Sequence, residues 1–149
     1  MISPNAFWDS SALIPICFHE ATSGQADALF RQWSLVVWWG TAVEIESSFA
    51  RLRRSNGLND ADWQVALNHL STLKQSWHEI EPSSKLRDLA GTLMYRFPLA
   101  AADSLQLAAA LTWCQQRPVG RTFLSGDVRL CDAATLAGFT VIRLGVTTP

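Results

Sequence analysis

The sequence contains few cysteines, and they form no recognisable pattern. Only three occur among 149 residues, at Cys17, Cys114 and Cys131, and no two are spaced as a CxxC pair. An odd number of dispersed cysteines in apolar, helical surroundings argues against a disulfide framework and against a zinc site. The three histidines are dispersed as well. We therefore expect a reduced, cytoplasmic protein without a zinc or histidine-based centre.

Long apolar stretches and an excess of charge of one sign are also lacking. No run approaches the roughly 18 apolar residues of a membrane span, and the first residues do not have the pattern of a signal peptide. We therefore expect no membrane partner. The 12 basic and 13 acidic residues leave a formal net charge of −1. This balance argues against binding to nucleic acid through a strongly positive overall field, but it is compatible with local basic patches.

Hydrophobic residues are plentiful, at 48% of the chain against 17% for charged residues. This composition, with a length of 149 residues, predicts one globular domain over residues 1–149. No linker, repeat or low-complexity segment interrupts it. The seven tryptophans either fill the core or anchor a partner.

Short apolar runs alternate with segments of helical periodicity along the chain. The runs predict strands at 6–8 and 34–40, a strand and turn at 121–127, a short edge strand at 78–82 and a last buried strand at 139–144. The periodic segments predict helices at 11–17, 22–33, 41–57, 60–77, 83–96, 100–116 and 128–137. This alternation is typical of an α/β fold, a three-layer α/β/α sandwich with a central, mainly parallel sheet.

Two aspartates follow predicted strands directly. Asp9 comes after the first strand, and Asp127 comes just after the run "TFLS". Because the carboxyl ends of parallel strands meet at one edge of the sheet, both carboxylates should lie at that edge. Carboxylates that lie close together repel each other unless a cation sits between them. Mg²⁺ or Mn²⁺ is the natural partner of such oxygen ligands.

Each aspartate also has a purely structural explanation. Asp9 and Asp127 each precede a predicted helix, where a carboxylate can accept a backbone N–H as the N-cap. Asp103 begins the motif "DSLQ", which is typical of a capping box with Gln106 at the third helical position. A helix N-terminus also keeps a carboxylate ionised, as a metal ligand requires. The pattern leaves both explanations open.

The helix predicted at 41–57 carries two glutamates. Glu44 and Glu46 flank an apolar stripe through Ile45 and Phe49, at about 100° to either side. The periodicity does not distinguish between them, and a solvated glutamate is the simpler explanation for either one.

Four stretches of the sequence together resemble a PIN domain, specifically that of the VapC-type ribonuclease toxins of VapBC toxin–antitoxin pairs. They are "FWDSSALIPICFHE", "TAVEIESSFARL", "LAAADSLQLAAAL" and "FLSGDVRLCDAATLAGFTVI", which occur in this order over almost the whole chain. Each motif is weak alone, but the four in order are fairly specific. The resemblance implies a PIN-like fold and a Mg²⁺- or Mn²⁺-dependent endoribonuclease that hydrolyses RNA phosphodiester bonds.

The resemblance also implies which acids form the site. The first aspartate of the family falls on Asp9, and its helix glutamate falls on Glu44 because "EIESSFAR" is similar to the family pattern. The third and fourth acids fall on Asp103 and Asp127. By this resemblance the four acids are catalytic, and the three aspartates bind the metal.

Hydroxyl residues that support the site in this family fall on Ser10 and Ser125. The sequence departs from the family at Gln106, where a histidine is usual, and at Phe49, where a smaller residue or leucine is usual. Neither departure replaces an acid, so both concern the substrate and the partner more than the metal site.

An acidic site that cleaves RNA needs nearby cations to receive the phosphate backbone. The candidates are Arg51, Arg54 and Arg129, with Arg53 and Arg121 as further ones. The alternative for the "RLRR" segment is a solvated helix end with favourable placement in the helix dipole.

By the same resemblance, the partners are an RNA substrate, a cognate antitoxin protein and a second copy of the chain in a homodimer. The apolar stripe through Trp63, Leu67, Leu70 and Trp77 could line the groove for an antitoxin peptide, and core packing explains it equally well. A catalytically silent PIN-like module that binds RNA or protein is the alternative function. A receiver-like or phosphatase domain fits less well, because the last predicted strand offers Arg143 and no lysine.

Overall fold

A computed structural model describes residues 3–145. Its five strands form one sheet in the order β3-β2-β1-β4-β5, and every neighbouring pair is parallel. The predicted parallel sheet is therefore confirmed. The strands are β1 (Asn5–Trp8), β2 (Ser34–Trp38), β3 (His78–Ile80), β4 (Thr122–Ser125) and β5 (Thr140–Arg143).

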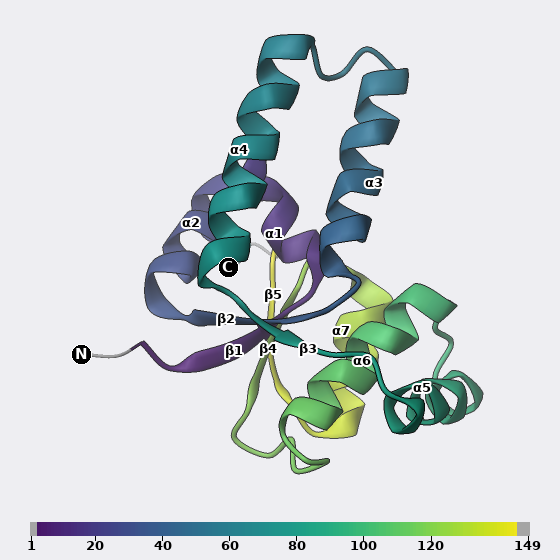
Figure 1. The fold of residues 1–149 in the computed structure, drawn as a ribbon. Helices are drawn as coiled ribbons and strands as arrows, with labels where there is room; N and C mark the ends of the chain where they lie inside the picture. Colours follow the sequence, from purple (N-terminus) through teal and green to yellow (C-terminus); the bar gives the residue numbers. More distant parts are fainter. Residues whose placement is uncertain (1–2, 146–149) are drawn as a thin grey trace.

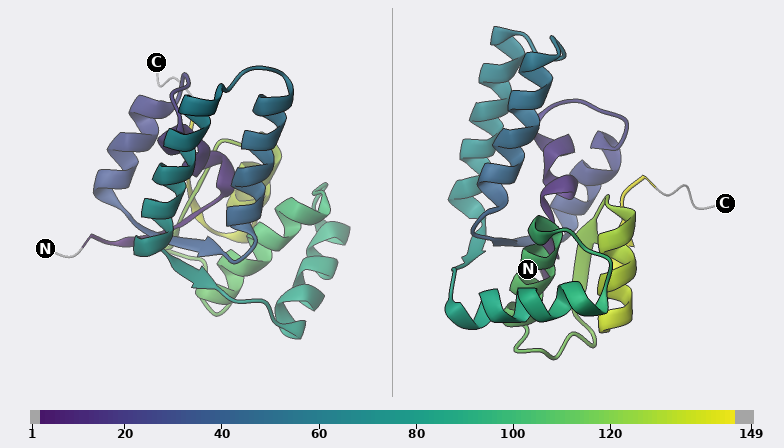
Figure 2. Two further views of the ribbon diagram at one scale, coloured as in Figure 1. Left: turned by 45° about the horizontal axis from the view of Figure 1, so that its top comes forward. Right: turned by 90° about the vertical axis from the view of Figure 1, so that its right-hand side faces the viewer.

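Helices cover both faces of this sheet, as a three-layer α/β/α sandwich requires (Figure 1). One face carries α1 (Ser10–Cys17), α2 (Ser23–Gln32), α3 (Thr41–Arg54) and α4 (Asp60–Ser76). The other face carries α5 (Ser84–Arg96), α6 (Ala101–Trp113) and α7 (Val128–Ala137). Helices α3 and α4 lie side by side and extend away from the sheet, as all the views show (Figures 1 and 2).

The central strand β1 divides the core into two clusters. Ala6 and Trp8 point into the cluster under α1–α4, and Phe7 points into the cluster under α5–α7. All three side chains are fully buried. The Phe7 ring stacks on Phe123 of β4 with 5.4 Å between ring centroids. A strand that is buried on both faces reads as a continuous apolar run, which is how β1 appears in the sequence.

The pairing of β1 with β4 positions the site. Trp8 is in register with Leu124, and the backbone N–H of Asp9 donates to the carbonyl oxygen of Leu124 at 2.9 Å. Asp9, which follows β1, and Ser125 to Asp127, at and beyond the end of β4, therefore lie together at the carboxyl edge of the sheet.

The last strand is less buried than the sequence predicts. The segment 139–144 does not form a buried strand, because β5 lies at the edge of the sheet and its four residues are exposed or half-buried. Only the flanking Phe139 and Leu144 are buried. An apolar run shows that a strand forms, but its position in the sheet decides whether both of its faces are covered. The edge position predicted for β3 is confirmed.

The remaining elements agree with the predictions to within a few residues. Asn59 caps α4 by accepting the backbone N–H of Asp62, and Gly138 ends α7 with a φ of 117°. All three cysteines are free and buried, so the predicted absence of disulfides is confirmed. Within residues 3–145, no helix has both the length and the apolar character needed to cross a membrane.

The stacked pair of phenylalanines predicts a large stability effect. Phe7→Ala should lower the free energy of unfolding by about 3–5 kcal/mol, because a fully buried ring is lost from a packed core. Tyr95 of α5 is 96% exposed, so Tyr95→Ala should change the free energy of unfolding by less than about 0.5 kcal/mol. Urea denaturation of both variants measures the two effects. Similar losses in the two variants would contradict the packing described.

Candidate active site

A cavity of about 330 Å³ opens at the carboxyl edge of the sheet. Its walls come from the ends of β1 and β4, the starts of α1 and α6, and one face of α3. The residues that line it are Asp9, Ser10, Ser11, Ile14, Glu44, Ser47, Ser48, Arg51, Ala102, Asp103 and Asp127. The structure thus brings all four predicted acids to one cavity, from segments that are far apart in the sequence.

Asp9 is held by hydroxyl groups and does not cap its helix. It occupies the N-cap position of α1, but its side chain accepts no capping hydrogen bond. Its Oδ1 accepts from Ser10 Oγ at 3.4 Å, and its Oδ2 accepts from Ser11 Oγ and from Ser125 Oγ, the latter at 2.9 Å. The capping explanation is therefore wrong for Asp9, a residue that is only 3% exposed and lines the cavity.

Ser11 is a site residue that the sequence analysis missed. Its hydroxyl donates to Asp9, accepts from the backbone N–H of Gly126 at 2.8 Å and lies 3.2 Å from Ser125 Oγ. Ser125 Oγ in turn accepts from the backbone N–H of Asp127 at 3.0 Å. This network ties the end of β1 to the end of β4. The signal in the sequence was the run "DSS", in which only the first serine received a role.

Asp127 and Asp103 differ in their local roles. Asp127 is the N-cap of α7, where its Oδ1 accepts from the backbone N–H of Leu130 at 2.9 Å. The capping explanation is therefore confirmed for Asp127, although the residue also lines the cavity. The capping box proposed for Asp103 is wrong, because α6 begins at Ala101 and its N-cap, Ala100, makes no side-chain hydrogen bond. Asp103 lies in the first turn of α6 instead.

Glu44 and Glu46 point in different directions. Glu44 is half-buried and lines the cavity, whereas Glu46 is exposed and lies beside α4, next to Lys74. Glu44 Oε2 accepts from Gln106 Nε2 at 2.6 Å, and the same nitrogen donates to Thr41 Oγ1 at 3.0 Å. Gln106 is fully buried. Gln106, which the sequence pattern assigned to a capping box, therefore holds Glu44 in place instead. Its position three residues after Asp103 was the available signal, since such residues share a helix face.

Burial and mutual repulsion make the ionised form of this cluster costly. Burial, followed by the charge of Asp9, raises the pKa of Glu44 to about 7. Burial, followed by the charges of Asp127 and Asp9, raises the pKa of Asp103 to about 6, although Arg129 opposes this shift. Burial also raises the pKa of Asp9, against the hydrogen bonds from its serines. A cation in the cavity would relieve all of these costs.

The donor set of the cavity fits a hydrated hard cation. All of its charged ligands are carboxylates, and its neutral polar side chains are hydroxyls, which suit Mg²⁺ or Mn²⁺. Within residues 3–145, no three His, Cys, Asp or Glu side chains are grouped closely enough to hold a metal ion by themselves. Mg²⁺ usually keeps several waters and takes only one or two carboxylates directly. The arrangement therefore matches a largely water-mediated site better than a closed cage.

The arginines divide into two groups. Arg51 lines the cavity and donates from Nη2 to Ser48 Oγ at 3.1 Å, and Arg129 is close enough to influence Asp103. Arg54 is exposed on the last turn of α3 and is not among the residues that line the cavity. Arg53 pairs with Asp60 at 2.7 Å. The helix-end explanation therefore suits Arg53 and Arg54 better than a role in the cavity.

The sequence was compared with family models and with curated proteins. No family model matches it, and no curated protein matches it.

Comparison of the fold, in contrast, finds several solved structures. The toxin VapC20 of Mycobacterium tuberculosis, described as cleaving the sarcin–ricin loop, is 16% identical, with a TM-score of 0.65 over 93% of this chain and 99% of that chain. VapBC2 of Rickettsia felis, bound to a promoter DNA fragment, is 10% identical, with a TM-score of 0.63 over 93% and 98%. FitAcB of Neisseria gonorrhoeae is 15% identical, with a TM-score of 0.61 over 91% and 96%.

These similarities cover nearly the full length of both chains, although few residues are identical. At such identities they establish the fold alone. The five parallel strands, the helices on both faces and the match to VapC structures agree with each other. The chain therefore has the fold of a VapC-type PIN domain.

Proposed function

We propose that this protein is a metal-dependent endoribonuclease that hydrolyses phosphodiester bonds in RNA, and that it is the toxin of a type II toxin–antitoxin pair. One observation carries the proposal: Asp9, Glu44, Asp103 and Asp127 come from four separate segments and line one cavity. Buried acids with raised pKa values are typical of functional sites, because a fold gains no stability from gathering them. The sarcin–ricin loop cleavage described for the fold neighbour VapC20 supports the reaction class.

In this proposal Asp9, Asp103 and Asp127 hold Mg²⁺ or Mn²⁺, directly or through water. When bound, the cation supplies a water of lowered pKa and stabilises the charge on the leaving oxygen. The hydroxyls of Ser10, Ser11 and Ser125 fix the orientation of the Asp9 carboxylate, as partners of metal ligands do.

Glu44 completes the acidic pocket as the proton acceptor. Its Oε2 accepts the hydrogen bond from Gln106, and we assign its other oxygen, Oε1, to accept the proton of the attacking water. Without a cation, burial and the charge of Asp9 raise the pKa of Glu44 to about 7, and a bound cation would lower it and keep the carboxylate ionised, as a proton acceptor must be. Arg51 and Arg129 lie near the acids and receive the phosphates on either side of the cleaved bond.

The proposed partners are a cognate antitoxin and a second copy of the chain. Support comes from a fold neighbour, a Klebsiella pneumoniae structure described as a toxin–antitoxin complex. The apolar stripe of α4, through Trp63, Leu67, Leu70 and Trp77, can be explained without a groove for an antitoxin peptide. Leu70 is buried, and Trp63, Leu67 and Trp77 pack against the same core cluster. Core packing therefore accounts for the stripe.

A catalytically silent module that binds RNA or protein is the second candidate. The observation that favours it is that, in the described part of the chain, no three potential ligands converge on one point. The two candidates differ in whether RNA is cut when Mg²⁺ or Mn²⁺ is supplied.

RNA cleavage separates these candidates. Purified protein should cut structured RNAs with Mg²⁺ or Mn²⁺ but not with EDTA, and Asp9→Asn should lower the rate by about 100-fold or more, because a buried metal ligand is lost. Asp132 is exposed on α7 and lies outside the cavity, so Asp132→Asn, with the same change of charge, should cleave like the wild type. Gel-resolved cleavage rates provide the measurement. Cleavage that persists in EDTA, or an Asp9→Asn variant with full activity, would contradict the proposed site.

The raised pKa values predict how stability depends on pH without metal. A carboxyl group with a higher pKa in the folded state binds protons more tightly there, so its contribution to stability falls as pH rises from the unfolded to the folded pKa. For Glu44 this window runs from 4.5 to about 7. In EDTA, the wild type should therefore have a lower free energy of unfolding at about pH 8 than at about pH 5.

Two variants isolate the contribution of Glu44. Glu44→Gln should show a smaller fall in stability over this window, whereas Glu46→Gln, altered at an exposed position on the same helix, should follow the wild type. Urea titrations across the pH range measure the difference. Added Mg²⁺ or Mn²⁺ should stabilise the wild type more at high pH than at low pH. The same pH dependence in wild type and Glu44→Gln would show that Glu44 is not electrostatically strained.

A further inference from the structure

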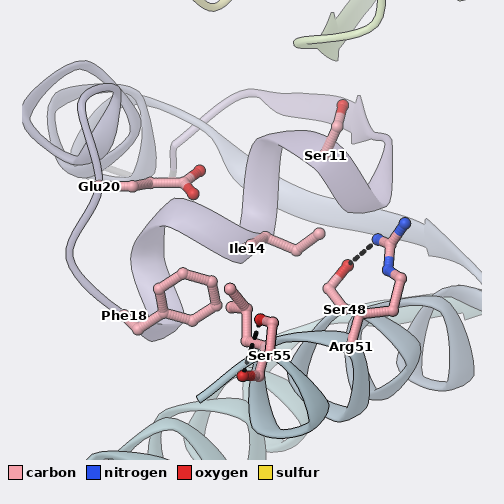
Figure 3. Close-up of a pocket in the computed structure, with 8 residues that line it drawn as sticks. Ser11, Ile14, Phe18, Glu20, Ser48, Arg51 and Ser55 are labelled. Atoms are coloured by element: carbon pink, nitrogen blue, oxygen red, sulfur yellow. Dashed lines mark hydrogen bonds between the residues drawn. The ribbon is translucent and has the colours of Figure 1, made fainter. Parts of the chain in front are cut away.

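A second and larger cavity of about 520 Å³ lies next to the acidic one, and Figure 3 shows the residues that line it. It lies between α1 and α3 and shares four lining residues with the acidic cavity: Ser11, Ile14, Ser48 and Arg51. The other lining residues are Phe18, Glu20, Leu52 and Ser55. Its volume is in the range that accommodates a small organic ligand. The two cavities are therefore neighbours, and the acids line the smaller one.

The chemistry of the second cavity differs from that of the first. Ile14, Phe18 and Leu52 give it an apolar wall, and the Phe18 ring points into the space (Figure 3). That ring is held in place by an edge-on contact with Phe49, with 5.8 Å between ring centroids. A half-buried aromatic ring of fixed orientation is a surface on which a flat base can stack.

Opposite charges occupy the two ends of the second cavity. The carboxylate of Glu20 extends over it from one end, and Arg51 lies at the other end, next to the acids (Figure 3). The only ion pair within residues 3–145 joins Arg53 to Asp60, so no salt bridge neutralises either group. Arg51 donates to Ser48 Oγ and keeps its charge for a ligand.

The backbone fixes the position of Glu20. Its N–H donates to Ser23 Oγ at 2.9 Å, and its carbonyl oxygen accepts from the N–H of Ser23 at 3.0 Å. Ser23 Oγ also donates to the carbonyl oxygen of Pro15 in α1, at 2.7 Å. The loop that carries Glu20 is therefore tied to the helix that forms one wall of the cavity.

We propose that the second cavity binds the unpaired RNA nucleotide next to the cleaved phosphodiester and that it prefers guanine. Proteins read single-stranded RNA by stacking bases on aromatic rings and by bonding their Watson–Crick edges. An ionised carboxylate has two acceptor oxygens and no donor. Guanine alone among the four bases presents two adjacent donors on that edge, N1–H and the N2 amino group, which match the Glu20 carboxylate. This inference rests on the proposed ribonuclease function.

The connection to the acidic cavity supports this assignment. In the proposed placement the base lies beside Phe18 and Glu20, and its phosphate points toward Arg51, which lines both cavities. The next phosphodiester then lies on the side of the acids. A peptide of only apolar residues would pack on the apolar wall but would leave Glu20 and Arg51 without partners. A basic peptide could pair an arginine with Glu20, and the binding measurement below distinguishes it from a nucleotide.

Cleavage mapping on a pool of single-stranded RNAs of random sequence tests the preference. In the wild type, sites with guanosine on one fixed side of the cut bond should be favoured by about tenfold or more over the other bases. In Glu20→Gln, the ratio of guanosine sites to other sites should fall toward one, because the amide offers one acceptor oxygen and not two. The ratio is read within each variant and does not depend on its overall rate. Glu46→Gln, at an exposed position outside both cavities, should keep the wild-type ratio and rate.

A binding measurement keeps the inference testable if no cleavage is seen. Fluorescence anisotropy with Asp9→Asn, and with Asp9→Asn combined with Glu20→Gln, compares short RNAs that carry guanosine, inosine or adenosine at one position. The single variant should bind the guanosine RNA more tightly than the inosine RNA, which lacks the N2 amino group, and the double variant should not distinguish them.

The outcomes separate the two proposals. If the wild type cleaves RNA but the base preference is absent or unchanged in Glu20→Gln, the guanine site is wrong and the ribonuclease proposal stands. If the wild type cleaves no RNA with either metal, the ribonuclease proposal is wrong. Equal binding of the three RNAs by Asp9→Asn would overturn the guanine site in either case, and a protein segment would then be the better occupant of the cavity.

Discussion

The parallel pairing of β1 with β4 is the constraint on which the rest of the site depends. Because Trp8 is in register with Leu124, the chain leaves both strands at the same edge, where Asp9 meets Ser125. Two parallel strands are joined by a long crossover connection and not by a tight turn. Residues more than a hundred positions apart in the sequence can therefore lie next to each other at the ends of β1 and β4. Hydroxyl hydrogen bonds then hold the Asp9 carboxylate in a single orientation.

The same constraint imposes an electrostatic cost. Glu44 and Asp103 reach the edge from helices on opposite faces of the sheet, and burial together with mutual repulsion raises the pKa of each. The fold offsets part of this cost with neutral donors: Gln106 bonds Glu44, and serines bond Asp9. Nothing in core packing requires acids at these positions. The ionised acids of this site repel each other when no ligand is bound, and their oxygens are the ligands that a hard cation prefers. Both properties are consistent with a site that is completed by a cation.

Much of the architecture could be predicted because periodicity and helix-end residues are local signals. Asn59 and Gly138 ended up at the helix ends where the sequence placed them, and the apolar runs became strands. Local signals led to a wrong or incomplete prediction where a side chain bonds to a distant part of the chain. The "DSLQ" motif looked like a capping box, yet α6 begins earlier and Gln106 reaches across to Glu44. The role of Ser11 was missed for the same reason, since its partners lie on the far strand end.

By itself, the sequence determined the α/β class, the order of the elements, the reduced cysteines and the candidate acids, because each follows from composition, from spacing within one segment or from the resemblance of the motifs. Only the tertiary structure decided that β5 is an edge strand, that Ser11 belongs to the site, and that Asp127 caps its helix while Asp9 does not. It also brought Glu44, which only the resemblance had favoured over Glu46, to the cavity. The physical reason is that a helix or strand restricts where a side chain points only relative to its own axis. Which surroundings that side chain meets depends on how the elements pack against one another.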